Sequence, residues 1–248
     1  MKVLIFDVWG DYAHFRKIYT TTSPLTYSIP TRTSLCGLIG AIIGLSKENN
    51  DYLNYFRLNQ AKIGLRIVNY VKKVHIAENL IHTKDAKGIG MNLITTRTQI
   101  RFEFLKDPKY RIYFWHNDES LYTKLKESLS KHKAKYTPCL GLSENIANFE
   151  YVGEIEAVKK DKNDNFIQIH SVIPIEKVEK GNGINFKIQD REYFKEIIPI
   201  EMDIDRVIKK YGDILYERSG NPIEARLTKP YYEINYKNGT RENIVFVE

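Results

Sequence analysis

A strand followed by an aromatic and basic loop, a proline and a glycine-spaced apolar helix is the feature that most constrains this fold. Lys2 to Val8 has the apolar, β-rich content of a buried strand. The run Thr31-Arg32-Thr33-Ser34, after a proline, offers hydroxyls suited to N-capping. We therefore predict a helix over Leu35 to Leu45.

Three glycines recur every three or four residues on one face of that helix, at Gly37, Gly40 and Gly44. A glycine inside a helix costs about 1 kcal/mol relative to alanine, so the pattern predicts a face that lies very close to a sheet. The apolar run is too short for a bilayer, which needs about 20 residues. We therefore expect no membrane span.

Composition limits the other classes of site. The two cysteines, Cys36 and Cys139, match neither a zinc nor a thioredoxin spacing, and the histidines form no HxxxH or HxH pair. Phosphate-binding loops and nucleophile motifs are absent from the sequence. We expect buried free thiols, no metal and no cofactor. The N-terminus lacks the pattern of a signal peptide, which predicts a cytoplasmic protein.

The net charge of +7 is unevenly distributed. From Arg57 to Arg111 there are 12 Lys and Arg residues against 4 Asp and Glu residues, whereas Phe149 to Glu248 has 16 against 19. A localised positive field is expected of a partner with a phosphate backbone. A solvated basic face is the alternative, and charge alone does not separate the two.

The periodicity along the chain predicts a β-α-β-β-α-β order. Ala61 to Ile76 reads as a long strand whose partner is Thr98 to Lys106, and Tyr110 to Trp115 as a further strand. Asn117 or Asp118 can cap a helix with leucines every four residues, and Tyr151 to Val158 reads as the last strand. This order is typical of the ferredoxin-like, RRM-like fold.

Two further regions complete the expected α+β organisation. The basic, glycine-bearing segment His82 to Thr98 should be the exposed end of a hairpin. We expect a ferredoxin-like domain over residues 1–158 and a smaller β-rich C-terminal lobe over residues 159–248. Its expected strands are Phe166 to Ile173, Ile184 to Ile188, Glu224 to Leu227 and a hairpin around Asn238-Gly239.

The loop after the first strand combines residue types that suit RNA. Arg16, Lys17 and Arg32 can contact phosphates, and Tyr12, Tyr19 and Tyr27 can stack on unpaired bases. We expect Trp9 and Phe15, in contrast, to close the end of the core. Tyr12 and His14 are also the types needed for general acid–base cleavage of RNA. No second catalytic partner can be placed from the sequence.

Two strings give the chain a family resemblance. Phe6-Asp-x-Trp9-Gly10-x-Tyr12-Ala13-x-Phe15-Arg16, with Ser28-x-Pro30-Thr-Arg-Thr33-x-Leu-Cys36-Gly-Leu-Ile-Gly-Ala41, resembles the fifth Cas protein family of type I CRISPR systems. Tyr136-Thr-Pro-x-Leu140-Gly-x-Ser143-Glu-x-Ile-Ala147, followed by Val152-Gly-Glu154, strengthens the match. The sequence most resembles members of I-B-like systems.

The resemblance implies a repeat-associated (RAMP) fold with a protruding β-hairpin thumb over about residues 76–104. It implies a Cascade subunit in antiviral defence that caps the 5′ handle of the CRISPR RNA (crRNA), and that meets target DNA only indirectly. Its protein partners would be the seventh-family backbone subunit and the large subunit. We expect RNA contacts from Arg16, Lys17, Tyr27 and Arg32 in the loop, and from Lys84, Lys87, Arg97 and Arg101 in the thumb.

The I-C branch of the family offers an alternative, since its members are metal-independent endoribonucleases that process repeat RNA with tyrosine, lysine and histidine. That set does not match this chain residue by residue. Tyr12 and His14 are the positions to test for catalysis.

Overall fold

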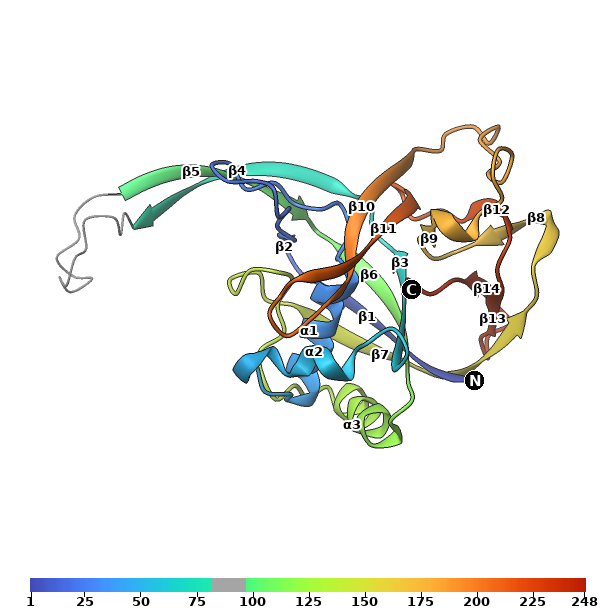
Figure 1. Cartoon of the computed structure of the whole chain (residues 1–248), viewed down its shortest axis with the longest axis horizontal. Coiled ribbons are helices and arrows are strands. Elements are labelled where there is room, and N and C mark those ends of the chain that lie inside the picture. Colours follow the sequence, from blue (N-terminus) through green and yellow to red (C-terminus); the bar gives the residue numbers. More distant parts are fainter. Residues whose placement is uncertain (82–96) are drawn as a thin grey trace.

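The computed structural model describes residues 1–81 and 97–248. Its central antiparallel sheet contains β1 (Lys2–Trp9), β3 (Ala61–Ile67), β6 (Lys109–His116) and β7 (Asn148–Lys160) in the order β7-β1-β6-β3. The helices α1 (Arg32–Ile43) and α3 (Glu119–Ser130) cover one face of it (Figure 1). This connectivity confirms the predicted ferredoxin-like fold.

The ends of α1 follow from its capping residues. The hydroxyl of Thr31 accepts a hydrogen bond from the Ser34 amide, and Gly44 closes the helix in the left-handed region at φ +74°. The helix therefore starts three residues before the predicted position and ends ahead of Leu45. The leucines predicted for α3 are buried, and Asp118 caps that helix by accepting from the Ser120 and Leu121 amides.

The predicted contact of the glycine face with a sheet is wrong. A Cβ built on Gly37 would lie 3.9 Å from the hydroxyl of Tyr52 in α2 (Tyr52–Tyr55), and one built on Gly40 would lie 3.7 Å from the ring of the same tyrosine. Both glycines border a groove of about 780 Å³ between α1, α2 and the loop that contains Tyr136. The opposite face of the helix enters the core through Leu35, Leu38 and Ile42.

The single long strand predicted over Ala61 to Ile76 is divided between two sheets. β3 pairs with β6, whereas β4 (Lys72–Ile81) pairs with β5 (Arg97–Lys106) in the thumb hairpin. β2 (Tyr12–Ala13) adds to the free edge of β5. In Figure 1 the thumb hairpin leaves the body as a long arm. The tip expected between His82 and Thr98 lies largely outside the described residues.

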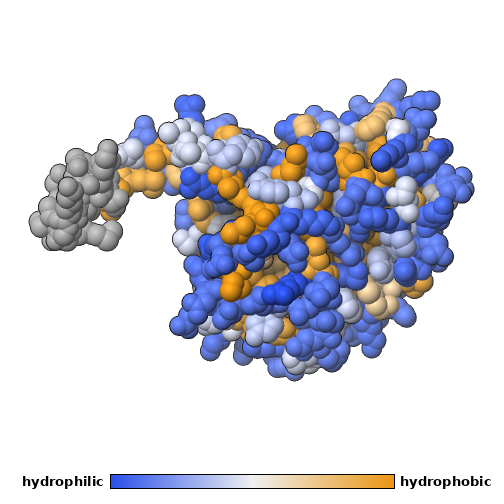
Figure 2. Space-filling view, viewed as in Figure 1, coloured by the Kyte–Doolittle hydropathy of each residue, from blue (hydrophilic) through white to orange (hydrophobic). Residues whose placement is uncertain are grey.

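The two faces of the thumb hairpin differ in polarity. The cross-strand pairs Val74–Phe104 and Ile76–Phe102 lie on one face, and His75–Glu103 and Ala77–Arg101 on the other. Apolar side chains are visible along the underside of the arm in Figure 2. One face is thus apolar and the other polar.

The C-terminal residues form β8 (Asn163–Ile169), β9 (Ile173–Pro174), β10 (Tyr193–Met202), β11 (Ile208–Glu217), β12 (Ile223–Leu227), β13 (Tyr231–Asn235) and β14 (Arg241–Ile244), with a short 3₁₀ turn at η3 (Ile175–Lys177). A second such turn, η1 (Glu48–Asn50), lies between α1 and α2. β13 pairs with β7, so the β13–β14 hairpin around Asn238-Gly239 extends the central sheet. The boundary predicted after residue 158 falls inside β7, and the division into two domains stays a prediction.

Two details of this region differ from the sequence prediction. The hairpin β10–β11 was not predicted, although it is paired along nearly its whole length. The strand predicted over Ile184 to Ile188 does not form, and Ile184 makes a single bridge to Ala225. Along the described part of the chain, no helix is long and apolar enough to cross a membrane.

A buried carboxylate fixes the β13–β14 hairpin to the sheet. Glu242 is 2% exposed and accepts hydrogen bonds of 2.6 Å from the hydroxyls of Tyr113 and Tyr236. The guanidinium of Arg66 pairs with the same carboxylate, and that of Arg111 lies 3.7 Å from it. Because buried charges are stable only when paired, this cluster determines how the hairpin docks.

Candidate nucleic-acid interface

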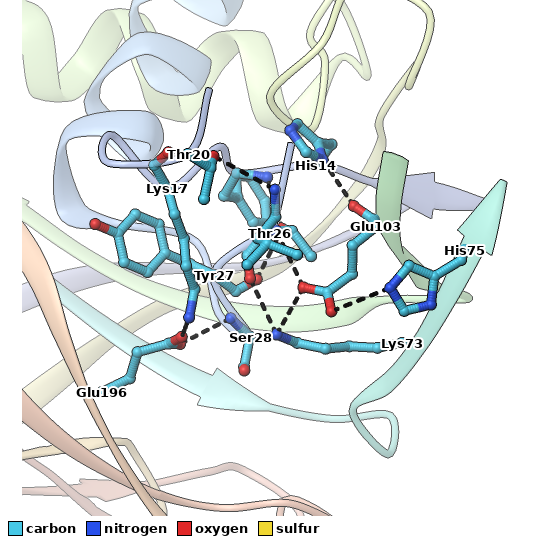
Figure 3. A network of polar contacts seen from close by, with 12 residues as sticks. His14, Lys17, Thr20, Thr26, Tyr27, Ser28, Lys73, His75, Glu103 and Glu196 are labelled. Atoms are coloured by element: carbon cyan, nitrogen blue, oxygen red, sulfur yellow. Dashed lines mark hydrogen bonds and ion pairs between the residues drawn. The ribbon is translucent and has the colours of Figure 1, made fainter. Parts of the chain in front are cut away.

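The loop between β1 and α1 folds back onto the base of the thumb hairpin through Glu103 of β5 (Figure 3). One carboxylate oxygen, Oε1, accepts hydrogen bonds from the Thr26 amide at 3.1 Å and from Lys73 Nζ at 3.0 Å. The other, Oε2, lies 3.8 Å from Nε2 of His75. The Lys73 ammonium also donates to the Thr26 carbonyl at 3.0 Å. These contacts hold the loop against the polar face of the thumb hairpin.

A second carboxylate, Glu196 of β10, holds the loop from the opposite side. It lies 2.7 Å from Lys17 Nζ and accepts a hydrogen bond of 2.8 Å from the Ser28 amide. Burial alone would lower the pKa of Lys17, but the hydrogen bond and charge of Glu196 outweigh it and raise that pKa. Lys17 thus has an internal structural partner in addition to any contact with a ligand.

The two arginines expected to contact RNA lie in opposite environments. Arg16 is exposed, and its guanidinium donates to the Thr20 carbonyl at 3.0 Å. Arg32, at the start of α1, is 2% exposed and donates to the carbonyls of Ala61 and Ile200 at 2.8 and 3.3 Å. The expectation of an RNA contact from Arg32 is therefore corrected, because its guanidinium joins α1, β3 and β10 inside the protein.

The tyrosines of the loop separate in the same way. Tyr27 is 3% exposed, which raises its pKa and places its ring below the surface, contrary to a role in stacking. Tyr12 and Tyr19 are 36% and 73% exposed, and the Tyr12 ring lies edge-on against Phe104 at 6.0 Å. Of the tyrosines considered, these two are available to unpaired bases.

His14 lies inside the protein, at 1% exposure. Its Nδ1 is 2.7 Å from the Glu103 carbonyl, and because a carbonyl only accepts, Nδ1 has the proton. Burial lowers the pKa of the ring, and the hydrogen bond to Glu103 partly opposes this. The rings of Phe102 and Phe104 lie against it at 5.6 and 5.5 Å. The structure thus separates His14 from the solvent where a substrate would bind.

The polar face of the thumb hairpin meets the loop at Glu103, which accepts from the Thr26 amide, and Arg16 is exposed on that loop opposite Thr26. Lys73, His75 and Arg101 alternate with apolar residues along β4 and β5 and so share this face. Arg97 is exposed on the same face nearer the tip. Lys84 and Lys87 lie outside the described residues. The structure therefore exposes Arg16 on the loop and Arg101 on the polar face of the thumb hairpin, and Glu103 joins these two segments.

Sequence reasoning missed the residues that organise this surface. Lys73 and His75 lie in the segment predicted as one long strand, and their parity with Glu103 across the hairpin is the signal that could have found them. No local pattern marks Glu196, because it approaches the loop from a strand 168 residues after Ser28. Within residues 1–81 and 97–248, no group of three or more His, Cys, Asp or Glu side chains could hold a metal ion.

Known proteins resemble the chain in sequence pattern and in fold. The family model described as "CRISPR-associated protein (Cas_Cas5)" matches residues 3–175. No curated protein matches the sequence. A crystal structure of a CRISPR protein from Archaeoglobus fulgidus is similar at 15% identity and a TM-score of 0.53, covering 98% of each chain.

Two other solved structures have the same fold. A chain of a CRISPR RNA-guided surveillance complex is similar at 10% identity and a TM-score of 0.51, covering 90% of this chain and 91% of its own. A crystal structure of a Cas protein is similar at 11% identity and a TM-score of 0.50, covering 90% and 95%. At these identities the likeness concerns the fold.

Proposed function

Because this chain belongs to the Cas5 family of CRISPR-associated proteins, we propose that it is the subunit of an RNA-guided complex that binds and caps the 5′ handle of the crRNA. The seventh-family backbone subunit and the large subunit of such a complex are the protein partners in this proposal. The similarity to a chain of a CRISPR RNA-guided surveillance complex supports it.

The observation that supports RNA binding best is the polar surface shared by the loop and the thumb hairpin. Arg16 is exposed on the loop, and Arg101 is exposed on the polar face of the hairpin along β5. Cationic side chains on one face supply phosphate contacts without a need for a sequence-specific pocket. Tyr19, exposed three residues after Arg16, can stack on unpaired bases of the handle. Tyr12 is also exposed, on the apolar side of the hairpin beside Phe104.

We propose binding without cleavage. The imidazole of His14, a candidate for acid–base chemistry, is buried between Phe102 and Phe104 and donates to a backbone carbonyl. A general base must lie within hydrogen-bond reach of the proton that it abstracts. In this position the ring supports the loop and does not face a ribose.

Fluorescence anisotropy with a labelled repeat-derived RNA tests the binding. The double variant Arg16→Ala/Arg101→Ala should weaken affinity and reduce the slope of log K against log salt by about 1.4, since each phosphate contact to a single strand contributes about 0.7. The control Lys195→Ala/Lys131→Ala removes two exposed lysines from other surfaces, β10 and the end of α3. Equal slopes for the two variants would contradict the assignment of this surface.

Cleavage is tested by incubating the purified chain with the same RNA in EDTA. We expect intact RNA. Cleavage at one fixed site that is lost in His14→Ala or Tyr12→Phe would instead support the endoribonuclease alternative.

A further inference from the structure

A lysine-lined pocket lies apart from the interface described above, beside the C-terminal residues of the chain. It has a volume of about 460 Å³, within the range of sites for small ligands. Figure 1 shows the C-terminus on the body of the molecule, far from the free end of the thumb hairpin. The lysines that line the pocket are Lys159, Lys177, Lys210 and Lys229.

The carboxylates of the pocket are already paired. Glu176 lies 3.1 Å from the ammonium of Lys229, and Glu248 lies 3.0 Å from that of Lys62 and 3.6 Å from that of Lys177. Among the described residues, no carboxylate lies within ion-pair distance of the other two lysines, Lys159 and Lys210. Lys159 and Lys210 therefore line the pocket without a direct ion pair to any described carboxylate, and the charge of Lys210 acts on Glu176 from a longer distance.

Lys177 makes the pocket more than a solvated basic surface. This side chain is 7% exposed, and its ammonium donates to the Phe246 carbonyl at 2.8 Å. Burial lowers its pKa, and the charges of Lys62 and Lys229 lower it further while Glu248 opposes them. Holding several cations around one cavity is unfavourable unless an anion compensates them.

The cations of the lining are lysines, and no arginine lines this pocket. A lysine ammonium binds a phosphate as a point charge, without the fixed fork of a guanidinium. The remaining lining contains Leu58, Pro230 and Tyr232, and the Tyr232 ring is held edge-on to Phe246 at 4.9 Å. Such a surface suits the sugar and base of a nucleotide.

We propose that this pocket binds the phosphate of a nucleotide, either free or within a strand, at a site separate from the handle interface. Lys159 and Lys210 contact the phosphate directly, Lys177 supplies buried positive charge, and Tyr232 borders the nucleoside. This assignment does not depend on where the crRNA handle binds.

Isothermal titration of the full chain with uridine 5′-monophosphate, inorganic phosphate and uridine tests the site. We expect the two phosphates to bind and uridine to give no signal. A 5′-phosphorylated pentauridylate distinguishes the sources, because tighter binding than the mononucleotide indicates a strand and equal binding a free nucleotide. Both of these outcomes support the site.

The variant Lys159→Gln/Lys210→Gln should weaken uridine 5′-monophosphate binding by about tenfold or more, the loss expected for charge-assisted hydrogen bonds. The matched control Lys195→Gln/Lys209→Gln removes two exposed lysines that pair with Asp213 and Asp203 outside the pocket. Arg16→Ala/Arg101→Ala should also leave this binding unchanged.

Three results would overturn the proposal. The first is that neither uridine 5′-monophosphate nor inorganic phosphate binds at concentrations of about 10 mM. The second is equal weakening in the pocket variant and the lysine control. The third is displacement of the nucleotide by polyglutamate at comparable concentration, which would assign the pocket to an acidic protein segment.

Discussion

Removing the carboxylate of Glu103 should release the loop between β1 and α1 from the thumb hairpin. The magnitude follows from its partners. The Thr26 amide belongs to a residue that is 0% exposed, and its hydrogen bond to Glu103 Oε1 is replaced by nothing in Glu103→Ala. An unsatisfied buried donor costs about 1–3 kcal/mol.

Lys73 adds less to this cost. Its side chain is 31% exposed and keeps its hydrogen bond to the Thr26 carbonyl, so the lost ion pair contributes at most about 1 kcal/mol. We expect Glu103→Ala to lower the free energy of unfolding by about 1–4 kcal/mol. Glu103→Gln keeps an acceptor for the Thr26 amide and should lower it by about 1 kcal/mol.

Urea denaturation of the full chain, followed by tryptophan fluorescence and circular dichroism, measures both variants. Because Arg16 lies on the released loop, Glu103→Ala should also bind the repeat-derived RNA more weakly in buffer without urea. Glu103→Gln should bind this RNA nearly as tightly as the parent does. A free energy of unfolding for Glu103→Ala within about 0.5 kcal/mol of the parent, the range of ordinary surface substitutions, would contradict this role of Glu103.

Three further predictions concern residues around the same loop. The pKa of Lys17 is raised above its ordinary 10.5, so the stability that Lys17 adds is complete below pH 10.5 and is lost as pH rises through the pKa of the folded state. In Lys17→Met the free energy of unfolding should fall less steeply as pH rises above about 10. The same pH dependence as in the parent would argue against the pair with Glu196. The pKa of His14 is lowered below 6.5, so the stability that its buried neutral ring adds is present above pH 6.5 and is lost as pH falls. Melting temperatures between about pH 5 and 8 should depend less on pH in His14→Phe than in the parent. An equal dependence on pH would count against a buried neutral His14. Gly141 has φ +95°, and an added Cβ would lie 1.9 Å from the His14 carbonyl oxygen, so Gly141→Ala should lower the free energy of unfolding by about 2–4 kcal/mol in urea denaturation. The control Gly239→Ala, at φ +84° with open space around it, should lower it by about 1–2 kcal/mol. Equal losses in the two variants would show that the clash with the carbonyl is relieved.

Local patterns in the sequence were sufficient for the elements of the ferredoxin-like domain. Capping hydroxyls located α1, leucine spacing located α3, and Asn238-Gly239 located the last hairpin, because each of these signals acts within a few residues. The prediction of one long strand over 61–76 was wrong because the alternation of side chains continues through the point where the chain leaves one sheet for another. The prediction that the glycine face contacts a sheet was wrong because glycine spacing indicates a close approach without indicating whether a sheet or a tyrosine makes it.

The site was harder to predict for a different physical reason. Residue type gives the chemistry of Arg32 and Tyr27, but their exposure depends on strands far away in sequence. The guanidinium of Arg32 finds its acceptors at Ala61 and Ile200, and a buried arginine with backbone partners is uncommon enough that a surface position was the reasonable expectation. Glu196 was missed because its role exists only once β10 has reached the loop.

The pairing of β1 has a consequence for synthesis of the chain. This strand emerges from the ribosome before the other strands of the sheet, and its hydrogen-bonding partners, β6 and β7, begin only at residues 109 and 148. At about 5–20 residues per second, the apolar Val3 to Phe6 segment waits on the order of 5–30 seconds for a neighbour. Glu242, the carboxylate that fixes the sheet's final hairpin, arrives later still. This early strand is therefore among the last to be paired on both sides. During that interval the nascent chain exposes an unpaired apolar strand to chaperones and to other copies of itself.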